Sequence, residues 1–202
     1  GLVDTVLARA GKQPTGANSL SDAALYIVPF VDYDGVVNGD QGKNRRPHDH
    51  NRDYVDGLYP ETTAIRQLIS TTKNETGGPD WFCFDLHCPY IRGRETNEHL
   101  YQVGSALPQR WQQQQHFGRI LERCNRGPLP YDPAGDLPHG QAWNQYPAEP
   151  PTSFGRWTGA QHNVQFTTTL EIPYALMEGV EVTPERLHLL GRDLAAAIGE
   201  LL

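Results

Sequence analysis

Apolar residues along this chain form two kinds of pattern: short continuous runs, and longer segments with helical spacing. Runs rich in β-branched and aromatic residues at 24–31 and 81–86 predict buried strands, and residues 32–35 are expected to turn the first of them. Residues 164–172 alternate in polarity, which predicts a third strand, and residues 100–103 predict a shorter one.

Helices are predicted where apolar residues recur on one face, at 1–10, 60–70 and 108–124. A further helix is expected to close the chain, with Thr183 as its N-cap and Pro184 at its first position. Because strands alternate with helices, the pattern predicts an α/β fold, a layered α/β/α domain around a mixed, mostly parallel central sheet.

Two further stretches are distinguished by their composition. The glutamine run at 112–115 is expected to be a solvated face of its helix. Residues 126–160 are dense in proline and glycine and predict a long loop. A loop of that length inside a compact domain is usually functional.

The size and charge of the chain exclude several classes of protein. Its 202 residues predict one domain spanning 1–202. A formal net charge of -7 leaves no basic footprint for nucleic acid or an anionic membrane, and no apolar stretch approaches membrane-spanning length. The first helix has no N-cap ahead of Gly1, so we expect the domain to be truncated at its N-terminus. The sequence makes no prediction about compartment or oligomeric state.

The three cysteines do not have the spacing of a disulfide framework. Cys83 and Cys88 bracket His87, which suggests a metal site. In a strand, however, Cys83 and His87 share a face while Cys88 points to the opposite one. A packed or merely local thiol is therefore favoured over a metal ligand.

Three polar motifs stand against apolar runs and carry the candidate chemistry. The segment PHDHNRDY contains Asn51 and Arg52, which could bind a carboxylate, although exposed arginine is common. His87 follows the apolar run FCFDL, and it could be a zinc ligand or simply a hydrogen-bonded histidine. Glu171 lies on an apolar strand, where a carboxylate is costly unless it is paired or used.

Taken in chain order, these motifs resemble those of the M14 zinc carboxypeptidases. PHDHNRDY resembles the family's DLNRN-type segment, FDLHC its strand-end zinc histidine, and TTLEIP its TFEL-type segment. YIVPFVDYDGV resembles the family strand that ends in a PDG turn, so the resemblance runs from about Leu25 to the C-terminal helix. GRETNEHLYQVG is similar to the cytosolic, deglutamylase-like branch.

The resemblance implies a metallocarboxypeptidase that cleaves the amide bond next to the free C-terminal carboxylate of a peptide or peptide-like substrate. Asn51 and Arg52 would bind that carboxylate. His87 would bind one zinc ion, and Glu171 would be the general base for a zinc-activated water. Asp49 would hydrogen-bond another zinc-ligating histidine.

One family motif is missing. No HxxE sequence, which would supply two further zinc ligands, occurs in the chain. In the family it lies just before a helix like residues 1–10, so we expect it upstream of Gly1. Because a catalytic zinc needs three protein ligands, these residues alone are predicted to bind zinc poorly. A fragment of a longer enzyme is favoured over a degenerate relative.

Two further positions are assigned from the resemblance less directly. Gly42 stands where the family has an oxyanion-stabilising arginine, so Lys43 or Arg45 is the candidate substitute, with solvated surface charge as the alternative. Tyr146 is the nearest candidate for the family tyrosine over the site. Counting back from the general base places Arg156 at the floor of the side-chain pocket, where a buried arginine would favour an acidic side chain.

Two other functions stay open. A non-catalytic relative could bind peptide tails through Asn51 and Arg52 after losing its zinc site. An unrelated α/β domain with chance matches would be favoured if His87 and Glu171 lay far apart in the fold.

Overall fold

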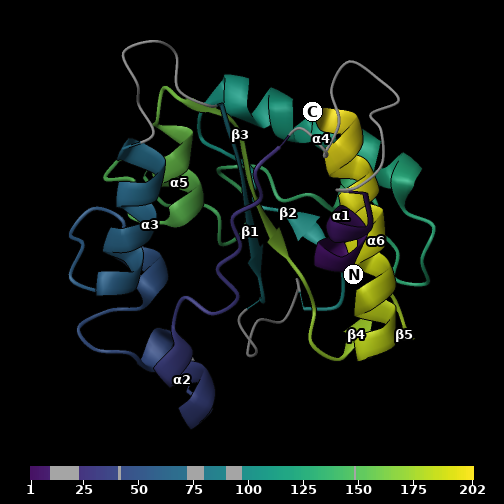
Figure 1. Ribbon diagram of the computed structural model, residues 1–202, viewed down its shortest axis with the longest axis horizontal. Coiled ribbons are helices and arrows are strands. Elements are labelled where there is room, and N and C mark those ends of the chain that lie inside the picture. Colours follow the sequence, from purple (N-terminus) through teal and green to yellow (C-terminus); the bar gives the residue numbers. More distant parts are fainter. Residues whose placement is uncertain (10–22, 41, 72–79, 90–96, 148) are drawn as a thin grey trace.

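A three-stranded mixed sheet lies between two layers of helices in the computed structural model of the protein (Figure 1). The structure describes residues 1–9, 23–40, 42–71, 80–89, 97–147 and 149–202. Its helices and strands are α1 (Leu2–Arg9), α2 (Tyr33–Asn38), α3 (Pro60–Thr71), β1 (Trp81–His87), β2 (Tyr101–Gln102), α4 (Pro108–Cys124), α5 (Phe154–Gly159), β3 (Val164–Glu171), β4 (Leu176–Met177), β5 (Val180–Glu181) and α6 (Pro184–Leu201). The 3-10 helices are η2 (Gly42–Asn44), η3 (His50–Arg52) and η4 (Pro133–Gly135).

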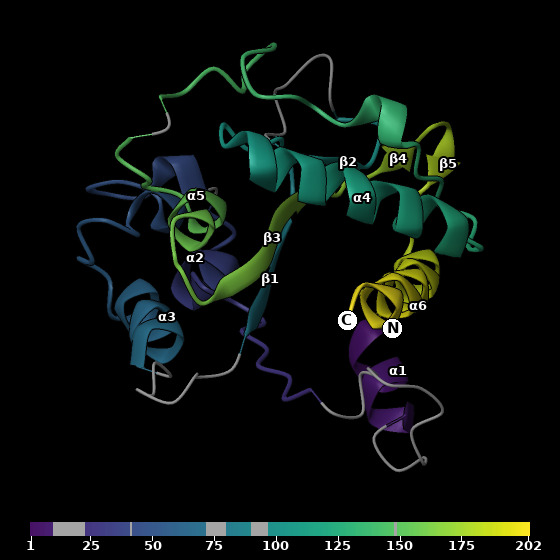
Figure 2. The same ribbon diagram turned by 90° about the horizontal axis from the view of Figure 1, so that it is seen from above.

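The view from above shows α3 and α5 on one side of β1 and β3, with α4 and α6 on the other (Figure 2). The strand order is β1-β3-β2, with β1 parallel and β2 antiparallel to β3. The predicted layered α/β fold with a mixed sheet is therefore confirmed. Among the described residues, no helix combines the length and the apolarity needed to cross a membrane.

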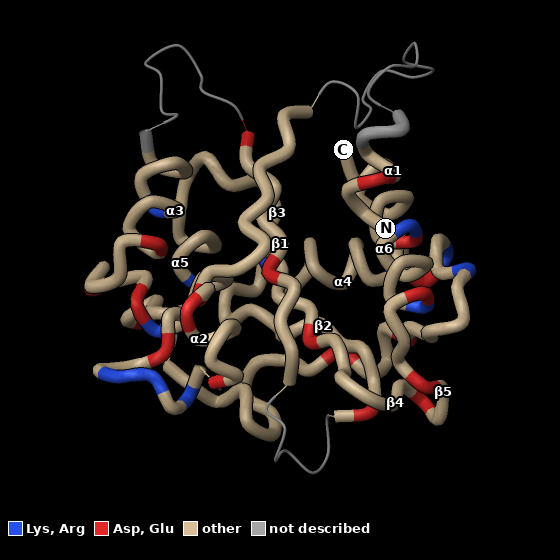
Figure 3. The backbone as a smooth tube through the Cα atoms, turned by 60° about the horizontal axis from the view of Figure 1, so that its bottom comes forward, with Lys and Arg blue, Asp and Glu red and all other residues tan. Residues whose placement is uncertain are grey.

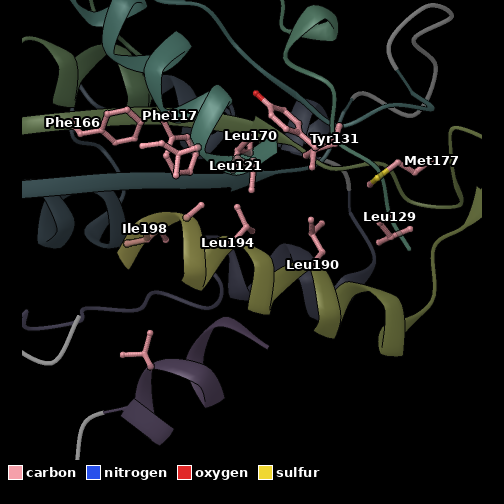
Figure 4. Packing of buried hydrophobic residues seen from close by; sticks show 14 residues of the cluster. Phe117, Leu121, Leu129, Tyr131, Phe166, Leu170, Met177, Leu190, Leu194 and Ile198 are labelled. Carbon is pink, nitrogen blue, oxygen red and sulfur yellow. The ribbon is translucent and has the colours of Figure 1, made fainter. Parts of the chain in front are cut away.

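The larger core cluster fills the space between the sheet and the helices α4 and α6. Leu190, Leu194 and Ile198 recur along one side of α6 and point toward Phe117 and Leu121 of α4 (Figure 4). The predicted caps are confirmed, because the Thr183 hydroxyl accepts a hydrogen bond from the Arg186 N–H and Pro184 begins the helix. This packing fixes one face of β3.

A second cluster covers the opposite face of the sheet and consists of Tyr54, Ile69, Cys83, Trp157 and Val164. Cys83 is 5% exposed, and burial raises the pKa of its thiol to about 12. Cys83 is therefore a packed thiol, the alternative that the sequence analysis favoured over a metal ligand. Because β3 is covered on both faces, its sequence VQFTTTLE is buried almost throughout.

The predicted strand at residues 24–31 is wrong. The segment forms no strand, and Leu25, Tyr26, Ile27, Val28 and Phe30 are 45% to 55% exposed. Its contact with the sheet is an aromatic one, between the rings of Tyr26 and Trp81 at 5.3 Å. An apolar run becomes a strand only where a neighbour completes its hydrogen bonds, and no described strand pairs with this segment. Residues 32–35 begin α2, with Asp32 as its N-cap.

Three other segments differ from the prediction. In the run predicted to be a solvated face, Gln112 and Gln115 are exposed, but Gln114 is buried at 3% exposure. Its side-chain amide donates to the carbonyls of Val103 and Thr167 and accepts from the Ser105 N–H. Residues 126–160 contain η4 and α5 within the predicted loop. The β4–β5 hairpin was not predicted, since each strand has only two residues.

Candidate active site

His87 and Glu171 meet at one edge of the sheet. They are register partners at the C-terminal ends of the parallel strands β1 and β3. Glu171 is 6% exposed, and its Oε2 atom has no hydrogen-bond partner among the described residues. Burial raises the pKa of Glu171, and the charges of His87, Lys43 and Arg52 partly offset that effect. The sheet therefore brings the predicted zinc ligand and the predicted base together.

Asp85 joins His87 on the same face of β1, two residues earlier. Its Oδ1 atom lies 3.5 Å from His87 Nδ1, and its Oδ2 atom accepts a hydrogen bond from the Thr169 hydroxyl at 3.2 Å. Burial lowers the pKa of His87, but Asp85 and Glu171 outweigh it and raise the pKa to about 9. A carboxylate on Nδ1 orients the ring and leaves Nε2 available as a ligand atom. Asp85 was not among the predicted site residues, although the D-x-H alternation at 85–87 was a signal for it.

Asp53 anchors the segment that carries Asn51 and Arg52. This carboxylate is fully buried, and burial alone would raise its pKa. Four hydrogen bonds instead lower the pKa of Asp53 to about 2. The donors are the Thr62 hydroxyl, the Tyr59 N–H (2.9 Å), His48 Nε2 (2.8 Å) and the Leu58 N–H (2.9 Å). No local pattern indicated Asp53, because its partners lie before it at His48, in the turn that follows and in α3.

Asn51 ties η3 to α5. Its side-chain oxygen accepts a hydrogen bond from the Phe154 N–H at 2.9 Å, which leaves the amide N–H groups free to face a ligand. Tyr54 reinforces this junction, because its N–H donates to the Thr152 carbonyl and its ring packs on those of Phe154 and Trp157. Asn51 and Arg52, the residues predicted to bind the substrate carboxylate, are thereby held against α5, the helix that carries Arg156.

Arg52 and Arg156 lie over the same tyrosine ring. Their guanidinium carbons are 5.7 Å and 5.4 Å from the centroid of Tyr146. Both donate to backbone carbonyls, Arg52 to Asn51 and Arg156 to Pro147. The structure thus brings Arg52 close to Tyr146 and Arg156, two predicted site residues that lie far from it in the sequence.

Asp49 lies at the start of η3, where its Oδ1 atom is buried without a hydrogen-bond partner among the described residues. A buried carboxylate oxygen without a donor costs about 1–3 kcal/mol. Asp49 and Glu171 therefore each have one buried carboxylate oxygen that lacks a donor among the described residues.

Lys43 and Arg45, the two candidates for the oxyanion position, differ in their surroundings. Gly42, at the start of η2, lies close to Asp49, which precedes η3. A Cβ atom added to this glycine would be 3.5 Å from the Asp49 Cβ. The charge of Lys43 acts on Glu171. Arg45 instead forms ion pairs with Asp32 at 2.9 Å and Asp40 at 3.4 Å. The tube view shows this basic stretch beside α2 (Figure 3).

The described residues do not by themselves form a metal site. No group of three or more His, Cys, Asp or Glu side chains among them is arranged to hold a metal ion. His87 is one candidate ligand, whereas a catalytic zinc takes three from the protein. Any such site requires further ligands from outside the described residues.

No protein-family model and no curated protein matches the chain. A crystal structure from Burkholderia mallei, of a protein provisionally named as a carboxypeptidase, shares the fold with a TM-score of 0.67 at 22% sequence identity. The match covers 99% of this chain and 52% of that one, so the chain spans about half the length of the matched structure. The protein therefore has a carboxypeptidase-like fold.

Proposed function

We propose that the full-length protein is a zinc-dependent metallocarboxypeptidase-type hydrolase. It cleaves the amide bond next to the free C-terminal carboxylate of a peptide or peptide-like substrate. The meeting of His87 and Glu171 at the ends of adjacent parallel strands is the observation that supports this proposal most strongly. Crevices at the C-terminal ends of strands are where α/β folds bind their ligands.

Arg52 and Asn51 hold the substrate in this proposal. The planar guanidinium of Arg52 donates two parallel hydrogen bonds to the terminal carboxylate, and the Asn51 amide adds a third. The fixed position of Asn51 on the Phe154 N–H supports this role, because an oriented donor loses little entropy on binding. The scissile amide is then aimed toward Glu171.

Glu171 moves the proton. A water oxygen forms a bond to the amide carbon, the C=O electron pair shifts to oxygen, and the water proton passes to Glu171. Glu171 then gives that proton to the leaving nitrogen as the C–N bond breaks. Its burial and the unpartnered Oε2 atom support this role, because a raised pKa makes the carboxylate a stronger base.

Lys43 is one of the cations whose charge acts on Glu171. Its charge would stabilise the oxyanion that forms when the amide carbon becomes tetrahedral. Zinc, when bound, would supply further polarisation, with His87 among its ligands and the remaining ligands from outside the described residues. Asp49 would orient one of those ligands through its unpartnered oxygen.

The proposal predicts a strict need for a free C-terminus. The full-length protein, supplied with zinc, should hydrolyse a peptide acid at least about 100-fold faster than the same peptide with a C-terminal amide. The amide removes the charge that Arg52 recognises. Kinetic parameters kcat/KM for the two peptides test this, and equal values would contradict the proposal.

A second candidate is a non-catalytic module that binds peptide tails through Arg52 and the oriented Asn51 amide alone. The same two peptides separate the functions. A binding module would bind the peptide acid more tightly than the amide and hydrolyse neither.

A further inference from the structure

The two-residue strand β2 lies directly beside the proposed general base. Its Tyr101 is the register partner of Glu171 in the antiparallel pair of β2 and β3, and His87 is the partner of Glu171 in β1. Opposed residues of neighbouring strands place their side chains on the same face of the sheet. Glu171 is therefore flanked by His87 and by Tyr101, which is 1% exposed. The position of β2 thus contributes to the position and the burial of Glu171.

A buried carboxylate, Asp136, closes the outer edge of β2. Its Oδ1 atom accepts the Gln102 N–H at 2.8 Å, and the Gln102 carbonyl accepts the Leu137 N–H at 2.9 Å. Both backbone hydrogen-bonding groups of Gln102 are therefore satisfied on the side away from β3. A strand of two residues makes few ladder bonds of its own, so these outer bonds contribute much of its attachment.

The fully buried side chain of Gln102 extends this attachment to three further elements. Its Nε2 atom donates to Asp136 Oδ2, at the end of η4, at 2.8 Å and to the Gln114 carbonyl of α4 at 2.9 Å. Its Oε1 atom accepts from the Thr168 hydroxyl of β3 at 2.9 Å. The Tyr131 hydroxyl also donates to Asp136 Oδ2, at 2.9 Å. Gln102 and Asp136 therefore join β2 to η4, α4 and β3.

Helix α4 encloses this network. A Cβ atom added to Gly118 would lie 2.8 Å from the Tyr131 hydroxyl oxygen and 3.0 Å from Gln102 Nε2, so the glycine lets the helix approach this closely. The donors to Asp136 are neutral groups, and the charge of the neighbouring Asp132 is negative. Burial outweighs the hydrogen bonds and raises the pKa of Asp136 to about 6. A carboxylate that is ionised at neutral pH is thus kept inside the protein at the expense of stability.

We propose that Asp136 is a positioning residue that holds β2 against the end of β3 and so keeps Glu171 in place. An ionised carboxylate only accepts hydrogen bonds, so both Gln102 groups and the Tyr131 hydroxyl must donate to it. Gln102 Oε1 is then the atom that remains to accept from Thr168 on β3. The consequence for catalysis rests on the proposed function of Glu171, whereas the attachment of β2 does not.

Asp136→Asn in the full-length protein tests this role, because it keeps the size of the side chain and replaces one acceptor oxygen with a donor. Hydrogen exchange followed by mass spectrometry should show the N–H groups of residues 101–103 exchanging at least about 10-fold faster than in the wild type. With a peptide acid, kcat should fall about 10- to 100-fold and KM should change little, because displacement of the base slows the proton transfer. Tyr131→Phe removes one donor and keeps the charge, so it should shift both readouts in the same direction by a smaller factor.

Asp132→Asn is the matched control. It removes the same charge four residues away, at an exposed position, and asparagine can still accept the Ala134 N–H as the N-cap of η4. Both the exchange of residues 101–103 and kcat should stay at their wild-type values. Residues 190–198 of α6 provide an internal reference, because a loss of global stability alone would speed exchange there as much as in β2.

Unchanged exchange of residues 101–103 in Asp136→Asn, or an increase shared equally by α6, would overturn the inference. So would wild-type kcat in Asp136→Asn when the wild type hydrolyses peptide acids, a result that leaves the proposed function intact. Faster local exchange in a protein whose wild type hydrolyses no peptide acid supports the attachment of β2 by Asp136 and contradicts the proposed function.

Discussion

Replacing Glu171 with glutamine is expected to lower kcat by about 10²- to 10⁴-fold in the full-length protein. Glutamine has almost the same shape but cannot accept the proton of the attacking water. Because the partners of the terminal carboxylate are unchanged, KM should change little. Steady-state kinetics with a peptide acid measure both parameters.

Glu181→Gln is the matched control, since Glu181 lies exposed on β5. It should leave kcat unchanged. Turnover retained in Glu171→Gln would remove the general base from the proposed mechanism, whatever the effect on binding.

Asp53→Ala should lower the free energy of unfolding by about 3–5 kcal/mol. The substitution leaves two backbone N–H groups, the Thr62 hydroxyl and His48 without their acceptor in a fully buried position. It should also loosen Asn51 and Arg52, which precede it directly. Urea unfolding followed by fluorescence gives the free energy.

The pH dependence of stability gives an independent check on Asp53. Its pKa of about 2 is below the ordinary value of 3.8, so its contribution is complete above about pH 4 and is lost as the pH falls toward 2. The difference between wild type and Asp53→Ala should shrink over that range. Asp56→Ala, at an exposed position, should stay within about 0.5 kcal/mol of the wild type. A loss below about 1 kcal/mol for Asp53→Ala would contradict the anchoring role.

The elements that could be predicted well from the sequence have both a clear polarity pattern and a packing or pairing partner among the described residues. Residues 108–124 coincide with α4, and the strand predicted at 164–172 is β3 to within one residue. Residues 24–31 have an equally apolar pattern but no described pairing partner, and they form no strand. An apolar composition indicates that a segment tends to be buried, whereas a strand also needs a neighbouring strand that completes its backbone hydrogen bonds.

The residues of the candidate site fall into the same two groups, those that a local pattern predicts and those whose role depends on contacts elsewhere in the fold. His87 and Glu171 could be predicted because each ends an apolar run, and the parallel register then makes them neighbours. Asp53 could not be assigned from sequence, because its role comes from donors in three places: His48 before it, the turn that follows and α3. The closeness of Arg52 to Arg156 depends on how η3 packs on α5, through Asn51 and the Phe154 N–H. That contact joins segments that no local pattern relates.

A crystal structure of the full-length protein with zinc and a peptide acid whose scissile amide is replaced by a ketomethylene group tests the central claim most directly. Anomalous scattering locates the metal, and the difference density locates the ligand. The account predicts zinc bound to His87 beside Glu171, with the α-carboxylate of the ligand on Arg52. Zinc bound away from His87, or a ligand carboxylate that does not touch Arg52, would contradict it.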